Sequence, residues 1–447
     1  MPACDSNPEA TYKAVILLGG PAKGTRFRPL SLDQPVPLMS IGGYPLIFHH
    51  VEACAAVPGM REIILIGYYP KDQLSQFVDE CQRKFGIRMR YLQEFTPLGT
   101  AGGLYHFRDQ IMLGDPAAFF VMNSDVCCDF SLADMLAKHR PGTYTVMCTE
   151  ATRSQSVQYG CAVIRKGTDE IMHYVEKPAT FVSTMINCGV YILSPSIFQY
   201  LKSAVKVHKD AHFTFDLSSQ CNECVQMEQE VFQPLASRNC LFAYVTTRFW
   251  SQVKTAGAAI YANRHMLELY RTSHPDRLAT AQSIPDGPKI IGNVYIHPTA
   301  TVSPTAVLGP NVSVERFVTI GNGARVRESI LLQGAVVRDH ACVLFAVLGS
   351  SATIGEWTRV EGTPTDPNPN KPFAKIETKD LFNEKGQLNP SCTVIGSHVS
   401  VAPETIVRNS IVLRAQRVGS QLQKPNYPVI LQIVLATYKL WCQFSLT

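Results

Sequence analysis

Residues 17–37 read LLGGPAKGTRFRPLSLDQPVP and continue the apolar run Ala14–Leu18. An apolar run of this length predicts a buried strand, and the glycines directly after it predict a turn. Backbone N–H groups in such a turn can close on a phosphate because glycine places no side chain in the way. Arg26 and Arg28 add two guanidinium groups suited to phosphate oxygens. The stretch therefore predicts a phosphate site at the end of a buried strand.

Length and composition bound the class of protein. At 447 residues the chain is long enough for two or more domains, and its net charge of +5 with no basic run predicts no nucleic-acid partner. Fourteen cysteines without a repeated metal-ligand spacing predict free thiols in a reducing compartment. The N-terminal residues lack a secretory signal pattern, and the apolar stretch 427–444 is too short and too polar to span a membrane. We therefore expect a cytoplasmic protein that does not insert into a membrane.

The first half of the chain alternates short apolar runs with helical segments. Strands are predicted at 15–18, 62–66, 89–92, 118–122 and 145–148, with helical runs such as 46–55 and 72–84 between them. This alternation predicts a mostly parallel sheet with helices on both faces, whose strand ends form the ligand site.

Polar and glycine-rich stretches follow several of these segments. Asp125 stands at the end of one predicted strand, where it could bind Mg²⁺ or simply cap the next turn. The loop Pro97–Gly103 could admit a flat base or merely turn the chain. By itself, the pair Glu176 and Lys177 is most simply a solvated surface ion pair. The residue types alone leave these alternatives open.

The second half changes character near residue 288. Seven apolar residues from Ile290 to Val326 recur every six positions. A companion series with the same period lies four positions further along the chain. After Arg327 the first series fades, and the companion phase continues as Ile330, Val336, Cys342, Leu348, Ile354 and Val360. A sustained six-residue period is typical of a parallel β-helix whose coils bury their apolar residues by stacking. The proline-rich segment 361–391 interrupts the period and predicts a long projecting loop.

Together these stretches resemble the sugar-phosphate nucleotidyltransferase family. The resemblance covers residues 12–412 and rests on Gly24–Leu30, Leu98–Gly102, Asn123–Asp125, Tyr174–Pro178 and the hexapeptide period. It implies an α/β nucleotidyltransferase domain with a Rossmann-like, mostly parallel sheet, followed by a left-handed parallel β-helix of hexapeptide repeats. The predicted divisions are a nucleotidyltransferase-like domain at 12–272, a linker at 273–289, a β-helix at 290–413 with its inserted loop, and a divergent tail at 414–447.

The resemblance also implies a nucleotide-sugar site. In this family the first glycine-rich loop wraps the phosphates, the second faces the base, and the Glu-Lys-Pro motif with a later Asn meets the sugar and its phosphate. The matching positions are Gly19, Gly20, Gly24, Thr25, Arg26, Gly99, Thr100, Asn123, Asp125, Gly160, Glu176, Lys177 and Asn187.

Three departures from the family pattern bear on catalysis. The first loop carries two extra residues, Val36 stands where active members carry Lys, and Gln252 stands where they carry a second metal-binding Asp. Asp125 is what remains of the metal pair, so we expect weakened Mg²⁺ binding. Removing one well-placed charge typically costs about a hundredfold in rate. We therefore assign no catalytic residue, although Lys23 and the Gln252 carbonyl could partly compensate.

Within the family, the chain resembles the mannose-1-phosphate guanylyltransferases, on strings such as Gly103–Gln110 and Val360–Pro364. The resemblance implies a regulatory subunit that binds GDP-mannose, self-associates, and limits GDP-mannose synthesis together with a catalytic beta subunit. Two alternatives remain open. The chain could be an active guanylyltransferase that releases pyrophosphate from GTP and mannose 1-phosphate, or a noncatalytic protein-binding scaffold.

Overall fold

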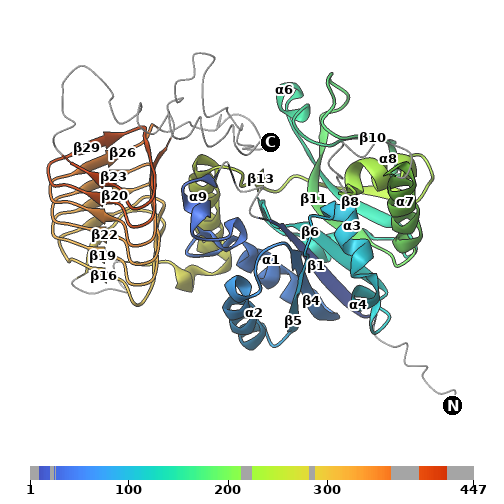
Figure 1. The fold of residues 1–447 in the computed structure, drawn as a ribbon, viewed down its shortest axis with the longest axis horizontal. Coiled ribbons are helices and arrows are strands. Elements are labelled where there is room, and N and C mark those ends of the chain that lie inside the picture. The colour runs from blue at the N-terminus through green and yellow to red at the C-terminus, as the bar shows by residue number, and fades with distance from the viewer. Residues whose placement is uncertain are drawn as a thin grey trace. The chain divides into compact units, whose positions relative to one another are not determined.

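The structure is a computed structural model that describes residues 10–20, 25, 27–212, 224–280, 287–363 and 392–419. It divides into two compact units (Figure 1). The first unit contains the N-terminal strand and most of residues 47–251. The second contains residues 24–46 and most of the chain after 252. The sequence predicts that the first domain extends to residue 272. The division into units instead groups the helix at Ala256–Ser273 with the β-helix.

The sheet of the first unit begins with four parallel strands. These are β1 (Tyr12–Gly19), β4 (Met60–Gly67), β5 (Arg88–Gln93) and β6 (Ala118–Asn123). The interiors of β1, β4 and β6 are buried, as is typical of a parallel sheet covered on both faces, whereas β5 at the sheet edge is mostly half-buried. The helices between them are α1 (Leu46–Ala55), α2 (Asp72–Phe85), α3 (Gly99–His106) and α4 (Arg108–Met112). This part confirms the predicted Rossmann-like arrangement.

The other half of the sheet contains antiparallel pairs. It is formed by β8 (Tyr144–Glu150), β9 (Cys161–Ile164), β10 (Ile171–Val175), β11 (Met185–Leu193) and β12 (Leu241–Thr246). Strand β11 runs antiparallel to β6, β8 and β9, and β12 runs parallel to β8. An all-apolar run shows that a strand is buried without showing its direction, so the sequence could not reveal this reversal.

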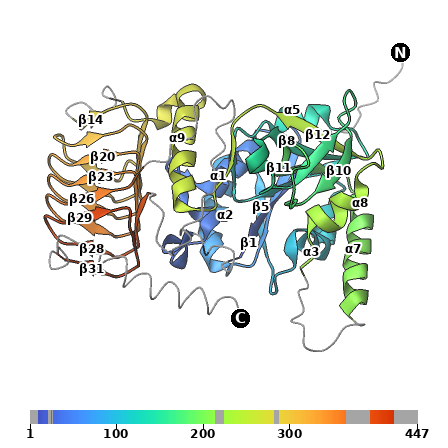
Figure 2. The same cartoon turned by 90° about the horizontal axis from the view of Figure 1, so that it is seen from above.

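The remaining elements of the first unit cover or extend the sheet. They are β7 (Val126–Cys128), α5 (Leu132–Lys138), α6 (Arg153–Ser156), α7 (Ile197–His212), the π-turn η4 (Glu228–Phe232), α8 (Gln233–Leu235) and β13 (Trp250–Gln252), whose last residue already falls in the second unit. Helix α7 lies beside α3 and η4, with α8 following η4 directly (Figure 2). None of the described helices is long and apolar enough to cross a lipid bilayer.

A buried cluster of charged side chains lies near the amino ends of β1, β4 and β5, opposite the carboxyl ends at which the ligand site is predicted. Glu62, 3% exposed, accepts the Lys13 ammonium at 2.8 Å and the Arg90 guanidinium at 2.5 Å, and Arg88 lies 3.3 Å away. Burial would raise the pKa of Glu62, but hydrogen bonds and charges from Arg90 and Lys13 outweigh it and lower that pKa.

The coils of the second unit form three parallel sheets of six strands each (Figure 1). The first sheet contains β14 (Lys289–Ile290), β17 (Val307–Leu308), β20 (Arg325–Arg327), β23 (Cys342–Leu344), β26 (Arg359–Glu361) and β29 (Ile406–Arg408). The second contains β15 (Val294–Ile296), β18 (Val312–Val314), β21 (Ile330–Leu331), β24 (Ala346–Leu348), β27 (Thr393–Ile395) and β30 (Ile411–Val412). The third contains β16 (Thr301–Val302), β19 (Thr319–Ile320), β22 (Val336–Val337), β25 (Thr353–Ile354), β28 (Ser400–Val401) and β31 (Arg417–Val418). The predicted parallel β-helix is thereby confirmed.

The inward-facing series does not fade after residue 327. It continues through Leu331, Val337 and Val343, because one residue is lost at the corner that leads into β21. Val336 and Cys342, which the sequence assigns to the inward companion phase, lie outside the core cluster and are half-buried. That assignment is wrong because a fixed six-residue period cannot follow a shortened coil.

Two sequence boundaries of the β-helix can be compared with the strand ladder. Leu348 pairs directly with Ile395, so the ladder continues across the predicted inserted loop. Most of that loop, residues 364–391, lies outside the described residues. At the other end, β31 pairs with β28, so the coils continue past the predicted end at 413. The tail from 420 onward lies outside the described residues.

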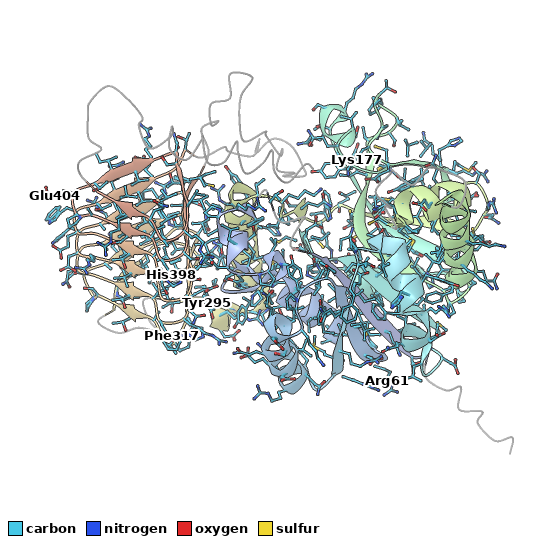
Figure 3. The ribbon with its side chains drawn as sticks, in the orientation of Figure 1. Arg61, Lys177, Tyr295, Phe317, His398 and Glu404 are labelled. Atoms are coloured by element: carbon cyan, nitrogen blue, oxygen red, sulfur yellow. The ribbon has the colours of Figure 1, made fainter. Side chains whose placement is uncertain are left out.

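Residues 27–46 are tied to α9 (Ala256–Ser273) and to the coils within the second unit. This segment carries η2 (Leu30–Leu32), η3 (Val36–Leu38), β2 (Ser40–Ile41) and β3 (Tyr44–Pro45), and η5 (Pro275–Arg277) follows α9. Fully buried Asn263 accepts hydrogen bonds at its Oδ1 from Gly42 N at 2.8 Å and Ser313 Oγ at 2.5 Å. The Tyr44 ring packs 5.5 Å from that of Tyr295, which is labelled in Figure 3.

Candidate functional site

The first glycine-rich turn follows β1 directly. Gly19 ends the strand with a φ of 66°, and its carbonyl oxygen accepts a hydrogen bond from Tyr68 N at 2.8 Å. A Cβ on Gly20 would stand 3.0 Å from Tyr68 Cβ, so the turn has little room for a side chain. Gly24 and Arg26 lie outside the described residues. The described part of the predicted phosphate site is therefore the tight turn at the tip of β1.

The second glycine-rich loop is held by a segment from much later in the chain. Val225 N donates to Leu98 O at 2.9 Å, and Ala101 N donates to Val225 O at 3.0 Å. Gly99 has a φ of 78°, and a Cβ there would collide with the Val225 backbone. The close approach of the Val225 backbone therefore explains why a glycine stands at position 99, whether or not a base binds there.

The predicted strand-tip carboxylate lies at the end of β6. Asn123 ends the strand, and half-buried Asp125 lies in the turn to β7. A Cβ on Gly189 of β11 would stand 2.7 Å from Asn123 Nδ2, so the Asn123 side chain packs against this glycine. Leu17 of β1 pairs with Asn123. The turn at Gly19 and the carboxylate of Asp125 therefore follow adjacent strand ends.

The predicted sugar end is formed by β10, β11 and the loop before β9. Asn187 donates its backbone N–H to Gly160 O at 2.8 Å. A Cβ on Gly160 would stand 2.5 Å from Glu176 Oε2 and would collide with the Tyr174 hydroxyl. That hydroxyl donates to Glu176 Oε2 at 3.2 Å. The structure thus brings together Gly160, Glu176 and Asn187, which are far apart in the sequence.

The Asn187 side chain, 8% exposed, is held within the protein. Its Nδ2 donates to the hydroxyls of Tyr174 and Tyr191, both at 2.9 Å, and its Oδ1 accepts from Gly189 N at 2.8 Å. Both amide protons are used in this way. Asn187 therefore orients two tyrosine hydroxyls at this end of the site.

Lys177 is the exposed member of the Glu-Lys pair. Its side chain is 64% exposed, and its Nζ lies 3.6 Å from Glu176 Oε1 (Figure 3). Its backbone N donates to Tyr159 O at 3.2 Å, and its φ is 43°. Left-handed backbone is uncommon for lysine, and such residues are concentrated at functional sites. The arrangement gives the site an accessible cation next to a partly buried carboxylate.

A carboxylate that the sequence does not single out joins the two parts of the site. Glu228 Oε1 accepts from Tyr191 OH at 3.1 Å, and Oε2 accepts from Thr100 Oγ1 at 3.2 Å. Burial raises the pKa of Glu228, and the negative charge of Glu176 raises it further. Burial also raises the pKa of Tyr174 and Tyr191 well above the ordinary value, so both hydroxyls stay protonated.

Two of the three departures from active family members, Val36 and Gln252, fall within the second unit. Val36 begins η3 with its side chain half-buried, and Thr25 accepts a hydrogen bond at its carbonyl oxygen from Arg28 N at 3.2 Å. Gln252 ends β13, and its Oε1 is shielded from solvent with no hydrogen-bond partner within the described part of the chain. A buried acceptor without a partner is uncommon in folded proteins.

The predicted Mg²⁺ position keeps one of the two carboxylates that active family members carry. Asp125 offers one carboxylate, Gln252 is neutral, and no group of three His, Cys, Asp or Glu side chains suited to a metal occurs in the described ranges. Mg²⁺ prefers several charged or carbonyl oxygens in near-octahedral geometry. Because Mg²⁺ is usually held by one or two carboxylates together with substrate phosphates, weakened binding at Asp125 stays a prediction, and a bound ion would there balance part of the phosphate charge.

The comparisons with known proteins cover both units. The family described as "Nucleotidyl transferase" matches residues 13–268, and the one described as "GMPPB C-terminal domain" matches residues 290–427. The chain is 53% identical to the mannose-1-phosphate guanylyltransferase regulatory subunit alpha-B of Danio rerio over 90% of this chain and 96% of that one. It is 53% identical to regulatory subunit alpha of Xenopus tropicalis, with the same coverage. The chain belongs to this family of guanylyltransferase alpha subunits. The alpha subunit of Sus scrofa, at 51% identity over 90% of this chain and 96% of that one, extends the likeness to a mammal.

Glu228 and Tyr191 have no place in the sequence motifs, and Tyr174 belongs to the Tyr174–Pro178 stretch without a predicted role in the site. Glu228 lies in the stretch Met227-Glu228-Gln229-Glu230, whose acidic pattern is that of a solvated helix turn. The available signal lay around the tyrosines, since Tyr174 precedes Glu176 by two residues on one strand face and Tyr191 follows Asn187 by four. Their meeting depends on the pairing of distant strands, which spacing does not reveal.

Proposed function

We propose that this alpha-subunit family member binds GDP-mannose and inhibits GDP-mannose synthesis by a catalytic beta subunit, without turning over substrate itself. The observation that carries the proposal is the contrast between the sugar end and the residue types at two positions of the family pattern. The sugar end is built from buried, mutually hydrogen-bonded groups. The positions that neutralise charge in active family members hold the uncharged side chains Val36 and Gln252.

Binding of the sugar nucleotide would use groups that accept or donate hydrogen bonds without reacting. The backbone turn at Gly19 and Gly20 would meet the diphosphate, and the accessible Lys177 ammonium would balance part of its charge. Glu176, 18% exposed, would accept from a sugar hydroxyl. These contacts hold a product-like ligand in its ground state, so they favour binding over catalysis.

Turnover would need more positive charge than these residues supply. Attack on the α-phosphate of GTP builds negative charge on the reacting group and on the departing pyrophosphate. Val36 brings no positive charge, and with Gln252 neutral, Asp125 is what remains of the carboxylate pair that holds Mg²⁺ in active members, so that charge is poorly neutralised. Removing two such groups together is expected to lower the rate by about ten-thousandfold if each removal costs about a hundredfold.

The regulatory role is supported by the relatives, whose names describe regulatory subunits of a mannose-1-phosphate guanylyltransferase. The proposal includes association with the catalytic subunit and with a second copy of this chain through the β-helix. It places the complex in the cytosol, in keeping with free thiols such as those of Cys54 and Cys148.

The test combines calorimetry with a pyrophosphate-release assay on the purified chain. We expect saturable binding of GDP-mannose and no sustained pyrophosphate release from GTP and mannose 1-phosphate. Steady pyrophosphate release would instead establish an active enzyme. If the chain showed neither binding nor release, the scaffold alternative would remain. Adding the beta subunit tests the regulatory part, because linkage requires each ligand's effect on the other to be reciprocal. If GDP-mannose strengthens an inhibitory association, the beta subunit must tighten GDP-mannose binding by the same factor.

A further inference from the structure

Glu228 is the end point of two hydrogen bonds that come from opposite parts of the proposed site. One comes from Thr100, at the start of α3 in the glycine-rich loop. The other comes from Tyr191, in the long strand β11 that also carries Asn187. The remaining links run from Asn187 through Tyr174 to Glu176. A continuous hydrogen-bonded path therefore runs from the loop at 99–103 to the Glu-Lys pair.

The direction of every link along this path is set by the number of protons available. Asn187 Nδ2 donates one proton to Tyr174 and one to Tyr191. Each phenol has a single proton of its own, which Tyr174 gives to Glu176 and Tyr191 gives to Glu228. The two carboxylates are therefore the terminal acceptors. Glu228 cannot be replaced by a donor without reversing or breaking a link.

The carboxylate is held in place by its own segment. Met227 N donates to Thr100 Oγ1 at 2.8 Å, and Val225 joins the Leu98–Ala101 loop through backbone hydrogen bonds on both sides. Glu228 also begins the π-turn η4. Such turns are rare and occur frequently at functional sites. These contacts fix the position of Glu228 relative to the glycine-rich loop, independently of its hydrogen bond to Tyr191 of β11.

We propose that Glu228 is a positioning residue that joins the glycine-rich loop at Thr100 to the sugar end at Asn187 and Glu176. It keeps these two ends in a fixed position relative to each other, so that both can hold the same sugar nucleotide. The proposal rests on the proposed function, because it assumes that these residues bind GDP-mannose. It assigns Glu228 no contact with the ligand.

The two ends depend on Glu228 to different degrees. Thr100 keeps a second anchor through Met227 N, and its loop keeps the Val225 backbone bonds. Tyr191 is fully engaged with Asn187 and Glu228, and without the carboxylate its buried hydroxyl loses its acceptor. Loss of Glu228 should therefore loosen the sugar end more than the nucleotide end.

The first experiment compares Glu228→Ala with the wild-type chain by calorimetry, using GDP-mannose and GDP as separate probes. We expect GDP-mannose to bind about tenfold more weakly and GDP to change by less than about threefold, because an unsatisfied buried hydroxyl perturbs the sugar end alone. Glu230→Ala is the matched control. Glu230 lies on the same turn, and its Oε1 accepts from Gln226 N at 3.2 Å. Both affinities should remain unchanged in this control variant.

The second experiment asks whether the effect travels through Tyr191. Tyr191→Phe should weaken GDP-mannose binding in the same direction, and the double variant with Glu228→Ala should be no weaker than Glu228→Ala alone. Thermal unfolding of each variant monitors folding. Equal losses for both probes, or additive losses in the double variant, would overturn the positioning role. Failure of the wild-type chain to bind GDP-mannose would instead overturn the proposed function.

Discussion

Gly160→Ala gives a steric test of the sugar end. The backbone of Gly160 lies outside the left-handed region, so alanine adds one methyl group without backbone strain. The new Cβ would stand 2.5 Å from Glu176 Oε2 and would collide with the Tyr174 hydroxyl. Tyr174 is 2% exposed and its hydroxyl is hydrogen-bonded to Asn187 and Glu176, so relieving this clash must strain those bonds. The Glu176 carboxylate, 18% exposed, must swing away.

The expected magnitude follows from the cost of overpacking. Adding a methyl group to a packed site typically costs about 1–3 kcal/mol. If that cost falls on the ligand-bound arrangement, GDP-mannose affinity should fall by about fivefold to 150-fold. The part that falls on the free protein should appear as a lower melting temperature.

The assay is calorimetric titration of GDP-mannose onto Gly160→Ala and the wild-type chain, with thermal unfolding in parallel. Gly419→Ala is the matched control, because a Cβ there meets nothing within 4 Å and its backbone is also outside the left-handed region. Unchanged GDP-mannose affinity in a folded Gly160→Ala variant would refute the assignment of this end to the sugar.

Three further predictions address stability and lost catalysis. Asn263→Ala should lower the free energy of unfolding by about 2–4 kcal/mol in chemical denaturation, because it leaves two buried donors without their acceptor. Glu62 has a lowered folded-state pKa, so its contribution is present above about pH 4.3, its ordinary value, and is lost as pH falls through the folded pKa. Glu62→Gln should remove that acid-side loss and cost about 3–5 kcal/mol near neutral pH, measured by denaturation across pH. Val36→Lys combined with Gln252→Asp should raise pyrophosphate release by about a hundredfold or more over the wild-type chain. No gain in this double variant would mean that other residues account for the lost activity.

Sequence patterns predicted the first half of the sheet because its strands are short, apolar and separated by helices. Residues 118–122 were predicted as a strand, and β6 is Ala118–Asn123. The direction of β11 could not be predicted, since a strand buried along its length has the same pattern either way. In the β-helix the repeat identified the architecture, but the shortened corner before Leu331 changed which residues face inward.

The candidate site was predictable where it rests on local motifs and unpredictable where it rests on distant pairings. Asn123 and Asp125 follow a strand that is visible in the sequence. Glu228 meets Thr100 because residues 225–227 dock on the glycine-rich loop, and this contact spans more than a hundred residues. Such contacts depend on the finished fold.

The most direct measurement of the central claim is a calorimetric titration of GDP-mannose onto the purified chain alone, with the ligand analysed afterwards. The account predicts saturable binding with the GDP-mannose recovered intact. The absence of saturable heat at ligand concentrations that saturate other sugar-nucleotide proteins would contradict it.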